Sequence, residues 1–167
     1  RQVRLFLPMV APTQLAPGFV DELVAMLRER RLSGTGLCIE LPSRDLLDHR
    51  DALTRVLGTL RQAGVRIGIA DYGRDWAAVH VLSTLSVDFL RLDRELVKLT
   101  STDKAVSSTL LALVRKGHQL GAQVIAPDVE SIERAHVLLR LGIDYGSGDG
   151  LGRAQAEPEF DFNRPIW

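Results

Sequence analysis

Short apolar runs alternate with longer amphipathic stretches along this chain. The short runs, rich in leucine and β-branched residues, predict strands at residues 3–7, 36–41, 66–71, 87–93, 123–126 and 143–145. The longer stretches predict helices at residues 19–30, 46–63, 76–82, 103–120 and 132–141. Gly64, Gly121 and Gly142 stand where three of these helices end, as glycines do at helix C-termini. The order of helix, glycine and strand is typical of βα units with a parallel sheet.

Six strands of this kind fit two α/β architectures. One is an open, doubly wound sheet, and the other is most of a (β/α)8 barrel. The chain has 167 residues, of which 46% are apolar, and this is enough for one sizeable core. Because no long linker or low-complexity stretch interrupts the pattern, we expect residues 1–167 to form a single domain.

Charge and cysteine content narrow the class of protein. The 21 basic and 21 acidic side chains give a formal net charge of zero, so we expect neither nucleic acid nor an anionic membrane as a partner. No apolar run approaches the roughly 18 to 20 residues that a membrane span needs. The single cysteine, Cys38, lies in an apolar run, which favours core packing and a reduced compartment. We therefore expect a cytoplasmic protein.

Charged side chains gather where the predicted strands end. Since parallel strands end at the same rim, this set would meet there: Glu40, Asp71, Arg91, Asp93, Asp128 and Glu130. A ring of carboxylates on one face of a barrel is the usual form of a divalent-metal site. The alternative is that each carboxylate caps the helix after its strand. Four or more together favour an ancestral metal site.

Residues 60–96, LRQAGVRIGIADYGRDWAAVHVLSTLSVDFLRLDREL, resemble the EAL family of cyclic di-GMP phosphodiesterases. The resemblance continues through VIAPDVES and GIDYGSGDGLGRA, and upstream it includes LFLPMVAPTQLAPGFV and LCIELPSRDLL. It covers essentially the whole chain and implies a (β/α)8 TIM-barrel-like fold, with about six parallel βα units present. The strand that carries the Glu-Ala-Leu motif has no match here. We therefore expect the C-terminal part of a longer EAL domain or protein.

The same resemblance predicts that catalytic groups are lost. Family members hold two divalent cations that activate the attacking water. Pro8 stands at the position of a ligand asparagine, Ala70 at that of the first of two paired aspartates, and Pro127 at that of the catalytic glutamate. Arg91 replaces the active-site lysine, and a planar guanidinium is no equivalent of a compact ammonium.

Two carboxylates, Glu40 and Asp71, remain as vestigial metal ligands. Because two carboxylates are too few for a pair of metal ions, we expect no Mg or Mn cofactor and no hydrolysis. The resemblance thus implies a degenerate EAL domain that is not an enzyme. We expect it to act as a regulatory module through a protein partner or through self-association.

An alternative is a receptor that binds cyclic di-GMP without cleaving it. Asp71, Asp93 and Glu130 match family positions that contact the nucleotide, and Arg91 is a candidate phosphate partner. Ser147 stands where the family has a glutamine, which counts against binding. An active phosphodiesterase is the third and least favoured reading.

Overall fold

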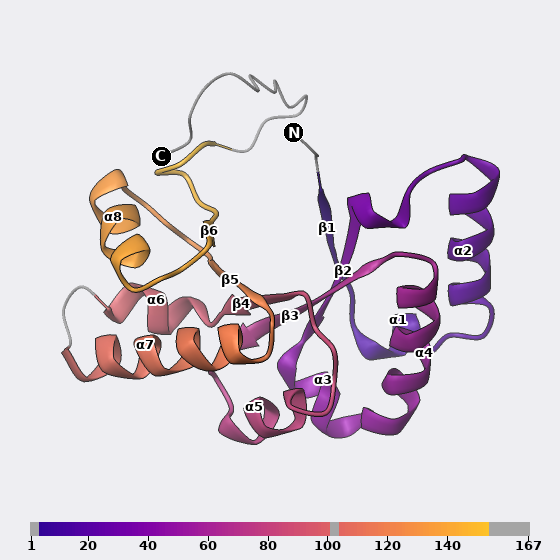
Figure 1. Ribbon diagram of the computed structural model, residues 1–167, viewed down its shortest axis with the longest axis horizontal. Coiled ribbons are helices and arrows are strands. Elements are labelled where there is room, and N and C mark those ends of the chain that lie inside the picture. The colour runs from indigo at the N-terminus through magenta and orange to yellow at the C-terminus, as the bar shows by residue number, and fades with distance from the viewer. Residues whose placement is uncertain (1–3, 101–103, 154–167) are drawn as a thin grey trace.

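The computed structural model describes residues 4–100 and 104–153. Within these ranges six parallel strands form one sheet, and each strand pairs with the next one along the chain (Figure 1). The strands are β1 (Leu5–Pro8), β2 (Leu37–Pro42), β3 (Arg66–Tyr72), β4 (Phe89–Leu92), β5 (Gln123–Ala126) and β6 (Tyr145–Gly146). The consecutive order and the curl of the sheet confirm the partial (β/α)8 barrel rather than the open, doubly wound sheet.

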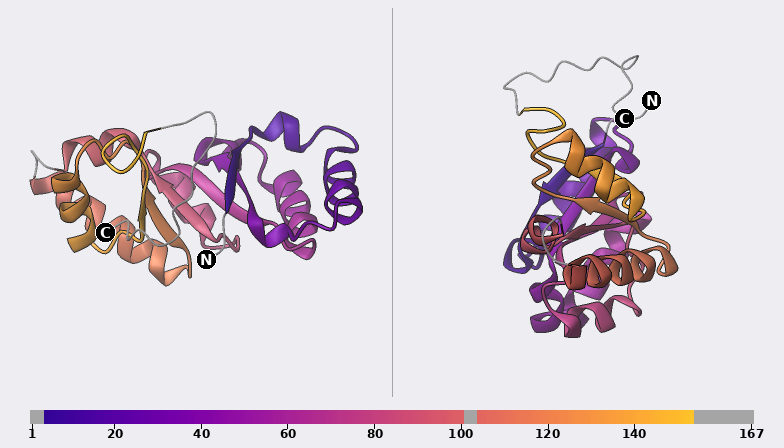
Figure 2. Two further views of the ribbon diagram at one scale, coloured as in Figure 1. Left: turned by 90° about the horizontal axis from the view of Figure 1, so that it is seen from above. Right: turned by 90° about the vertical axis from the view of Figure 1, so that its left-hand side faces the viewer.

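Helices connect the strands and cover the outer side of the curled sheet (Figure 2). Five of them make the crossovers between successive strands, as parallel pairing requires. They are α2 (Phe19–Glu29), α4 (Arg50–Gln62), α5 (Trp76–Leu82), α7 (Lys104–Gln119) and α8 (Ile132–Arg140). Shorter elements add to these, namely α1 (Ala11–Gln14), the 3₁₀ turn at Gly34–Gly36, α3 (Ser43–Asp48) and α6 (Arg94–Leu99). None of the helices in the described ranges has the length and apolar character of a membrane span.

The helices differ from the expectation in three places. The helix predicted at 46–63 is two helices, α3 and α4, because the backbone leaves the helical region at His49, where φ is −132° and ψ is 26°. The short helices α1 and α6 were not predicted, since each is too short for an amphipathic pattern to show. Residues 3 and 103, where a strand and a helix were predicted to begin, lie outside the described residues.

Apolar side chains pack on both faces of the sheet. The larger layer lies between the sheet and the helices and includes Ile39, Ile67 and Leu90, all fully buried. The smaller cluster lies on the inner face and holds Cys38, Phe89 and Ile125, with Phe6 packed against them. The Phe6 and Phe89 rings meet edge to face with centroids 5.1 Å apart. The predicted core position of Cys38 is confirmed.

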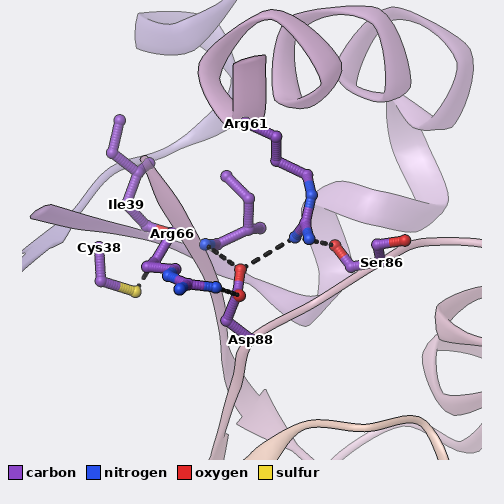
Figure 3. A network of polar contacts seen from close by, with 7 residues as sticks. Cys38, Ile39, Arg61, Arg66, Ser86 and Asp88 are labelled. Carbon is purple, nitrogen blue, oxygen red and sulfur yellow. Dashed lines mark hydrogen bonds and ion pairs between the residues drawn. The ribbon is translucent and has the colours of Figure 1, made fainter. Parts of the chain in front are cut away.

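Two aspartates fix the amino-terminal edge of the sheet in the same way. The Asp88 carboxylate accepts a hydrogen bond from the Ile67 amide at 2.9 Å (Figure 3). The Asp144 carboxylate accepts one from the Val124 amide at 2.7 Å. In each case a side chain that precedes one strand pairs with the backbone of the strand before it. Both contacts hold neighbouring strands in register at the edge opposite the rim where the strands end.

Candidate functional site

Glu40 and Arg91 face one another on the inner side of the sheet, although they lie on β2 and β4. The strand between them, β3, presents Gly68 at this level, and Gly68 pairs in register with Glu40. A Cβ atom at Gly68 would lie 3.1 Å from the Cys38 sulfur and 3.5 Å from Cγ of Glu40. A side chain at Gly68 would therefore crowd the Cys38 sulfur most, while its contact with Glu40 would be an ordinary one.

The contact between these residues is a close ion pair. Nε of Arg91 donates to both carboxylate oxygens of Glu40, at 2.8 and 3.0 Å. The Glu40 side chain is 6% exposed and that of Arg91 is 22% exposed, so solvent screens the pair only weakly. Charge-assisted bonds of this kind are the strong ones among hydrogen bonds.

Two further contacts fix the Arg91 guanidinium. Nη1 donates to the Ser147 hydroxyl at 3.2 Å, which joins β4 to the segment after β6. The guanidinium carbon lies 5.6 Å from the centroid of the Phe6 ring, within range of a cation–π contact. The structure thus brings four of the sequence-selected positions to one rim: Pro8 in register with Glu40, and Arg91 bonded to Glu40 and Ser147.

A bulge in β3 sets the position of Asp71. The register between β3 and β4 shifts between Ile69 and Tyr72, and Asp71 has a φ of 56°. This left-handed conformation is unusual for a residue other than glycine, and such outliers cluster at functional sites. The Asp71 carbonyl accepts hydrogen bonds from the Ser43 hydroxyl at 3.2 Å and from the Arg74 amide at 3.1 Å.

Ala70 and Tyr72 flank Asp71. Ala70 pairs with Pro42 and brings only a methyl group to the rim. Tyr72 is buried, and its hydroxyl donates to the Leu113 carbonyl at 3.2 Å. The bulge therefore anchors the end of β3 to α7 while leaving Asp71 partly exposed.

Asp93 is a helix cap in this structure. Its carboxylate accepts from the Glu95 amide at 2.9 Å and from the Leu96 amide at 3.3 Å, and the residue is 6% exposed. It begins α6 in the way that capping aspartates begin helices. Of the two readings that the sequence left open for strand-end carboxylates, capping is therefore confirmed for Asp93.

The segment after β5 carries Pro127, Asp128 and Glu130. Asp128 has a φ of 52°, and its carboxylate lies 3.4 Å from Nε of Arg94. Glu130 is exposed, and no hydrogen bond or ion pair of its side chain occurs within residues 4–100 and 104–153. Pro127 offers neither a side-chain donor nor a ligand atom at this point.

The glycines at 148 and 150 have a packing role. A Cβ atom at Gly148 would come within 2.4 Å of the Val129 amide nitrogen, and one at Gly150 within 2.3 Å of the Ser131 nitrogen. The backbone there is bonded to the segment after β5, since the Val129 amide donates to the Ser147 carbonyl at 2.9 Å. The two loops can lie this close only because neither glycine has a side chain.

Metal-ligating side chains do not gather at the rim. In the part of the chain that the structure describes, no group of three or more His, Cys, Asp or Glu side chains is placed to hold a metal ion. Glu40 is already bonded to Arg91, while Pro8, Ala70 and Pro127 supply no side-chain ligand atom. These residues do not fit a pair of divalent cations.

Comparisons with known proteins agree on one family. The model of the EAL domain matches residues 1–154. The chain is 26% identical over 145 residues to the probable cyclic di-GMP phosphodiesterase PdeN of Escherichia coli. The aligned region covers 86% of this chain and 28% of that protein. It is 28% identical over 136 residues to the bifunctional diguanylate cyclase/cyclic di-GMP phosphodiesterase MucR of Pseudomonas aeruginosa, covering 81% of this chain and 20% of that protein.

Solved structures agree with this result. The PaMucR phosphodiesterase in complex with cyclic di-GMP superposes with a TM-score of 0.81 at 26% identity, over 90% of this chain and 61% of that one. The Xanthomonas citri FimX EAL domain in complex with cyclic di-GMP gives a TM-score of 0.90 at 16% identity, over 96% of this chain and 63% of that one, and shows the fold alone. The chain spans less than two thirds of each of these relatives. It belongs to the EAL domain family.

Proposed function

We propose that this EAL domain is a regulatory module of cyclic di-GMP signalling that does not hydrolyse the nucleotide and acts through protein–protein interaction. The observation that carries the loss of hydrolysis is the ion pair between Arg91 and Glu40. Because both oxygens of Glu40 accept from a fixed guanidinium, a divalent cation would have to displace that group and then lie beside its positive charge. The pair therefore disfavours metal binding at Glu40, because Arg91 already neutralises the charge of this carboxylate.

The remaining positions support the same proposal. Hydrolysis by a two-metal mechanism needs ligands that hold both ions and a base that accepts the proton of the attacking water. Pro8 and Ala70 supply no side-chain ligand atom, and the Pro127 side chain cannot accept a proton. We therefore propose no catalytic step and no resident Mg or Mn for this chain.

The test is a turnover assay on the purified chain. Cyclic di-GMP would be incubated with the chain in Mg²⁺ and, separately, in Mn²⁺, and the nucleotide would then be resolved by chromatography. We expect it to be recovered intact. A linear dinucleotide that forms with the wild type and not with Glu40→Gln would overturn the proposal, because the product would then depend on this rim rather than on a contaminant.

The proposal of protein interaction rests on an exposed apolar side chain. Leu5 on β1 is 62% exposed. An apolar side chain that faces solvent to this extent is a contact that another protein surface can cover. We propose that Leu5 takes part in association with a partner or with a second copy.

A second candidate function is cyclic di-GMP binding without cleavage. Within the described residues, Nη2 of Arg91 has no acceptor, so part of the guanidinium is free for an oxyanion. Glu130 is exposed at the same rim and has no partner there. Relatives such as PaMucR have been solved with the nucleotide bound. Binding calorimetry without metal distinguishes this function from the first.

A further inference from the structure

Two arginines converge on one carboxylate at the edge of the sheet opposite the rim. Nη1 of Arg61 donates to Oδ2 of Asp88 at 2.9 Å, and Nη1 of Arg66 donates to Oδ1 at 2.7 Å. Figure 3 shows the two guanidinium groups on either side of the Asp88 carboxylate. Two positive charges and one negative charge leave this cluster with a formal surplus of one positive charge.

The two guanidinium groups are held in place, but each keeps N–H donors that have no acceptor among the described residues. Nη1 of Arg61 also donates to the Ser86 carbonyl at 3.0 Å, which fixes its plane. Within residues 4–100 and 104–153, the Nε and Nη2 groups of Arg61 and Arg66 donate to no acceptor. The side chains are 38% and 44% exposed, so these donors can be reached from solvent. Donors that are already oriented lose little conformational entropy when a ligand binds.

The cluster opens on a hollow of about 240 Å³. Asp88 is the single acidic residue among those that line it, and its oxygens already accept from both arginines and from the Ile67 amide. The lining residues are Thr35, Arg61, Gly64, Val65, Arg66 and Asp88. The surplus positive charge therefore faces a space large enough for a phosphate or carboxylate group.

A third guanidinium packs on the residue that follows Asp88 in the sequence. Arg4 stacks on the ring of Phe89, the residue after Asp88, with 4.9 Å between the guanidinium carbon and the ring centroid. Its Nε is buried and has no acceptor among the described residues. This adds positive charge on the inner side of the same edge.

We propose that Arg61 and Arg66 form an oxyanion-binding site at the amino-terminal edge of the sheet, separate from the rim that carries Glu40 and Arg91. The ligand is a phosphate or carboxylate group, because planar guanidinium forks match both kinds of oxyanion. Asp88 has a positioning role, since its carboxylate holds the guanidinium groups of Arg61 and Arg66 side by side. Its single negative charge cannot neutralise both positive charges.

The proposal is tested by NMR titration of the whole chain with inorganic phosphate, and separately with acetate, at constant ionic strength set by chloride. We expect saturable shifts of the side-chain Nε–H signals of Arg61 and Arg66 and of the Gly64 and Val65 amides. Stronger binding of phosphate would assign a phosphoryl ligand, and stronger binding of acetate a carboxylate. The absence of saturable shifts with both anions would overturn the proposal.

Variants separate a built site from general attraction by positive charge. Arg61→Gln and Arg66→Gln should each weaken anion binding by about tenfold, since each removes one charged donor pair. Arg55→Gln, at an exposed position on the same helix as Arg61, is the matched control and should leave the dissociation constant unchanged. Equal effects of all three substitutions would contradict the proposal. Arg61→Lys keeps the charge but not the fork, and should also weaken binding if a variant with glutamine does not fold.

Discussion

Nε of Arg91 donates to both carboxylate oxygens of Glu40, at 2.8 and 3.0 Å, across the strand that carries Gly68. Arg91 is therefore bonded to the carboxylate that, by resemblance to the family, would hold a metal ion. The positive charge beside Glu40 is that of an arginine side chain.

Breaking this pair on one side should destabilise the fold. Arg91→Met leaves the Glu40 carboxylate buried without its partner, and we expect the free energy of unfolding to fall by about 3 kcal/mol. Urea denaturation measures the loss. Arg140→Met, at an exposed position on α8, is the control and should change stability by less than about 0.5 kcal/mol.

Removing both partners should cost less than removing one. In the double variant Glu40→Met and Arg91→Met no charge is left buried alone, so most of the stability lost in Arg91→Met should return. The same denaturation experiment checks this. A double variant no more stable than Arg91→Met would show that the loss comes from packing rather than from the unpaired carboxylate.

Asp88 should matter for stability at the opposite edge. Asp88→Asn keeps the shape of the side chain but removes the charge that faces Arg61 and Arg66. Because both arginines are partly exposed, we expect a loss of about 2 kcal/mol rather than the full cost of a buried pair. Glu29→Gln, at an exposed position near the end of α2, serves as the control. Equal stability of the two variants would argue against a stabilising role for the ion pairs of Asp88 with Arg61 and Arg66.

Stability should fall in alkaline solution because of Cys38. Burial raises the pKa of its thiol to about 12, and the Glu40 and Asp88 carboxylates add to this effect. In the unfolded chain the thiol ionises near its ordinary pKa of about 8.5, so the unfolded state loses its proton first as the pH rises. The stabilising contribution is complete below about pH 8.5 and is lost progressively toward pH 12.

Urea denaturation between about pH 8 and about pH 10 checks whether stability falls as the pH rises. Burial also raises the pKa of Tyr72 to about 12, but this residue contributes strongly only at higher pH. Cys38→Ala should make the decline with pH shallower, whatever its effect on absolute stability. An unchanged slope in Cys38→Ala would mean that the thiol is not the group responsible.

Self-association should depend on the exposed side chain of Leu5. Leu5→Lys places a charge at an exposed apolar position and should shift the chain to a smaller assembly in light scattering after gel filtration. Met26→Lys, which changes a 53% exposed residue on α2, is the matched control and should leave the assembly unchanged. A monomeric wild type that captures no partner would refute association through Leu5.

The succession of strands and helices could be predicted from the sequence because each parallel strand is an apolar run and each crossover helix is amphipathic. The break at His49 could not, since neither proline nor glycine marks it. The short helix α6 depends on the Asp93 cap rather than on periodicity.

At the rim, the gathering of Glu40 and Arg91 followed from the rule that parallel strands end at the same face. The bond between them did not, because it spans β3 and the guanidinium is also placed by the Phe6 ring and the Ser147 hydroxyl, which are far from Arg91 in the sequence. The resemblance marks Ser147 as a position where a glutamine of the family is lost, yet the Ser147 hydroxyl accepts a hydrogen bond from Arg91. The roles of Asp71 and Glu130 in ligand binding stay predictions.

Binding of Mn²⁺ shows whether Arg91 has taken the place of a metal ion at Glu40. Electron paramagnetic resonance of free Mn²⁺ would be followed while the wild type and Glu40→Gln are added. We expect the two proteins to leave the same amount of Mn²⁺ free. Tight Mn²⁺ binding by the wild type that disappears in Glu40→Gln would mean that Glu40 is a working metal ligand despite its bond to Arg91, and that Arg91 has not replaced the metal ion.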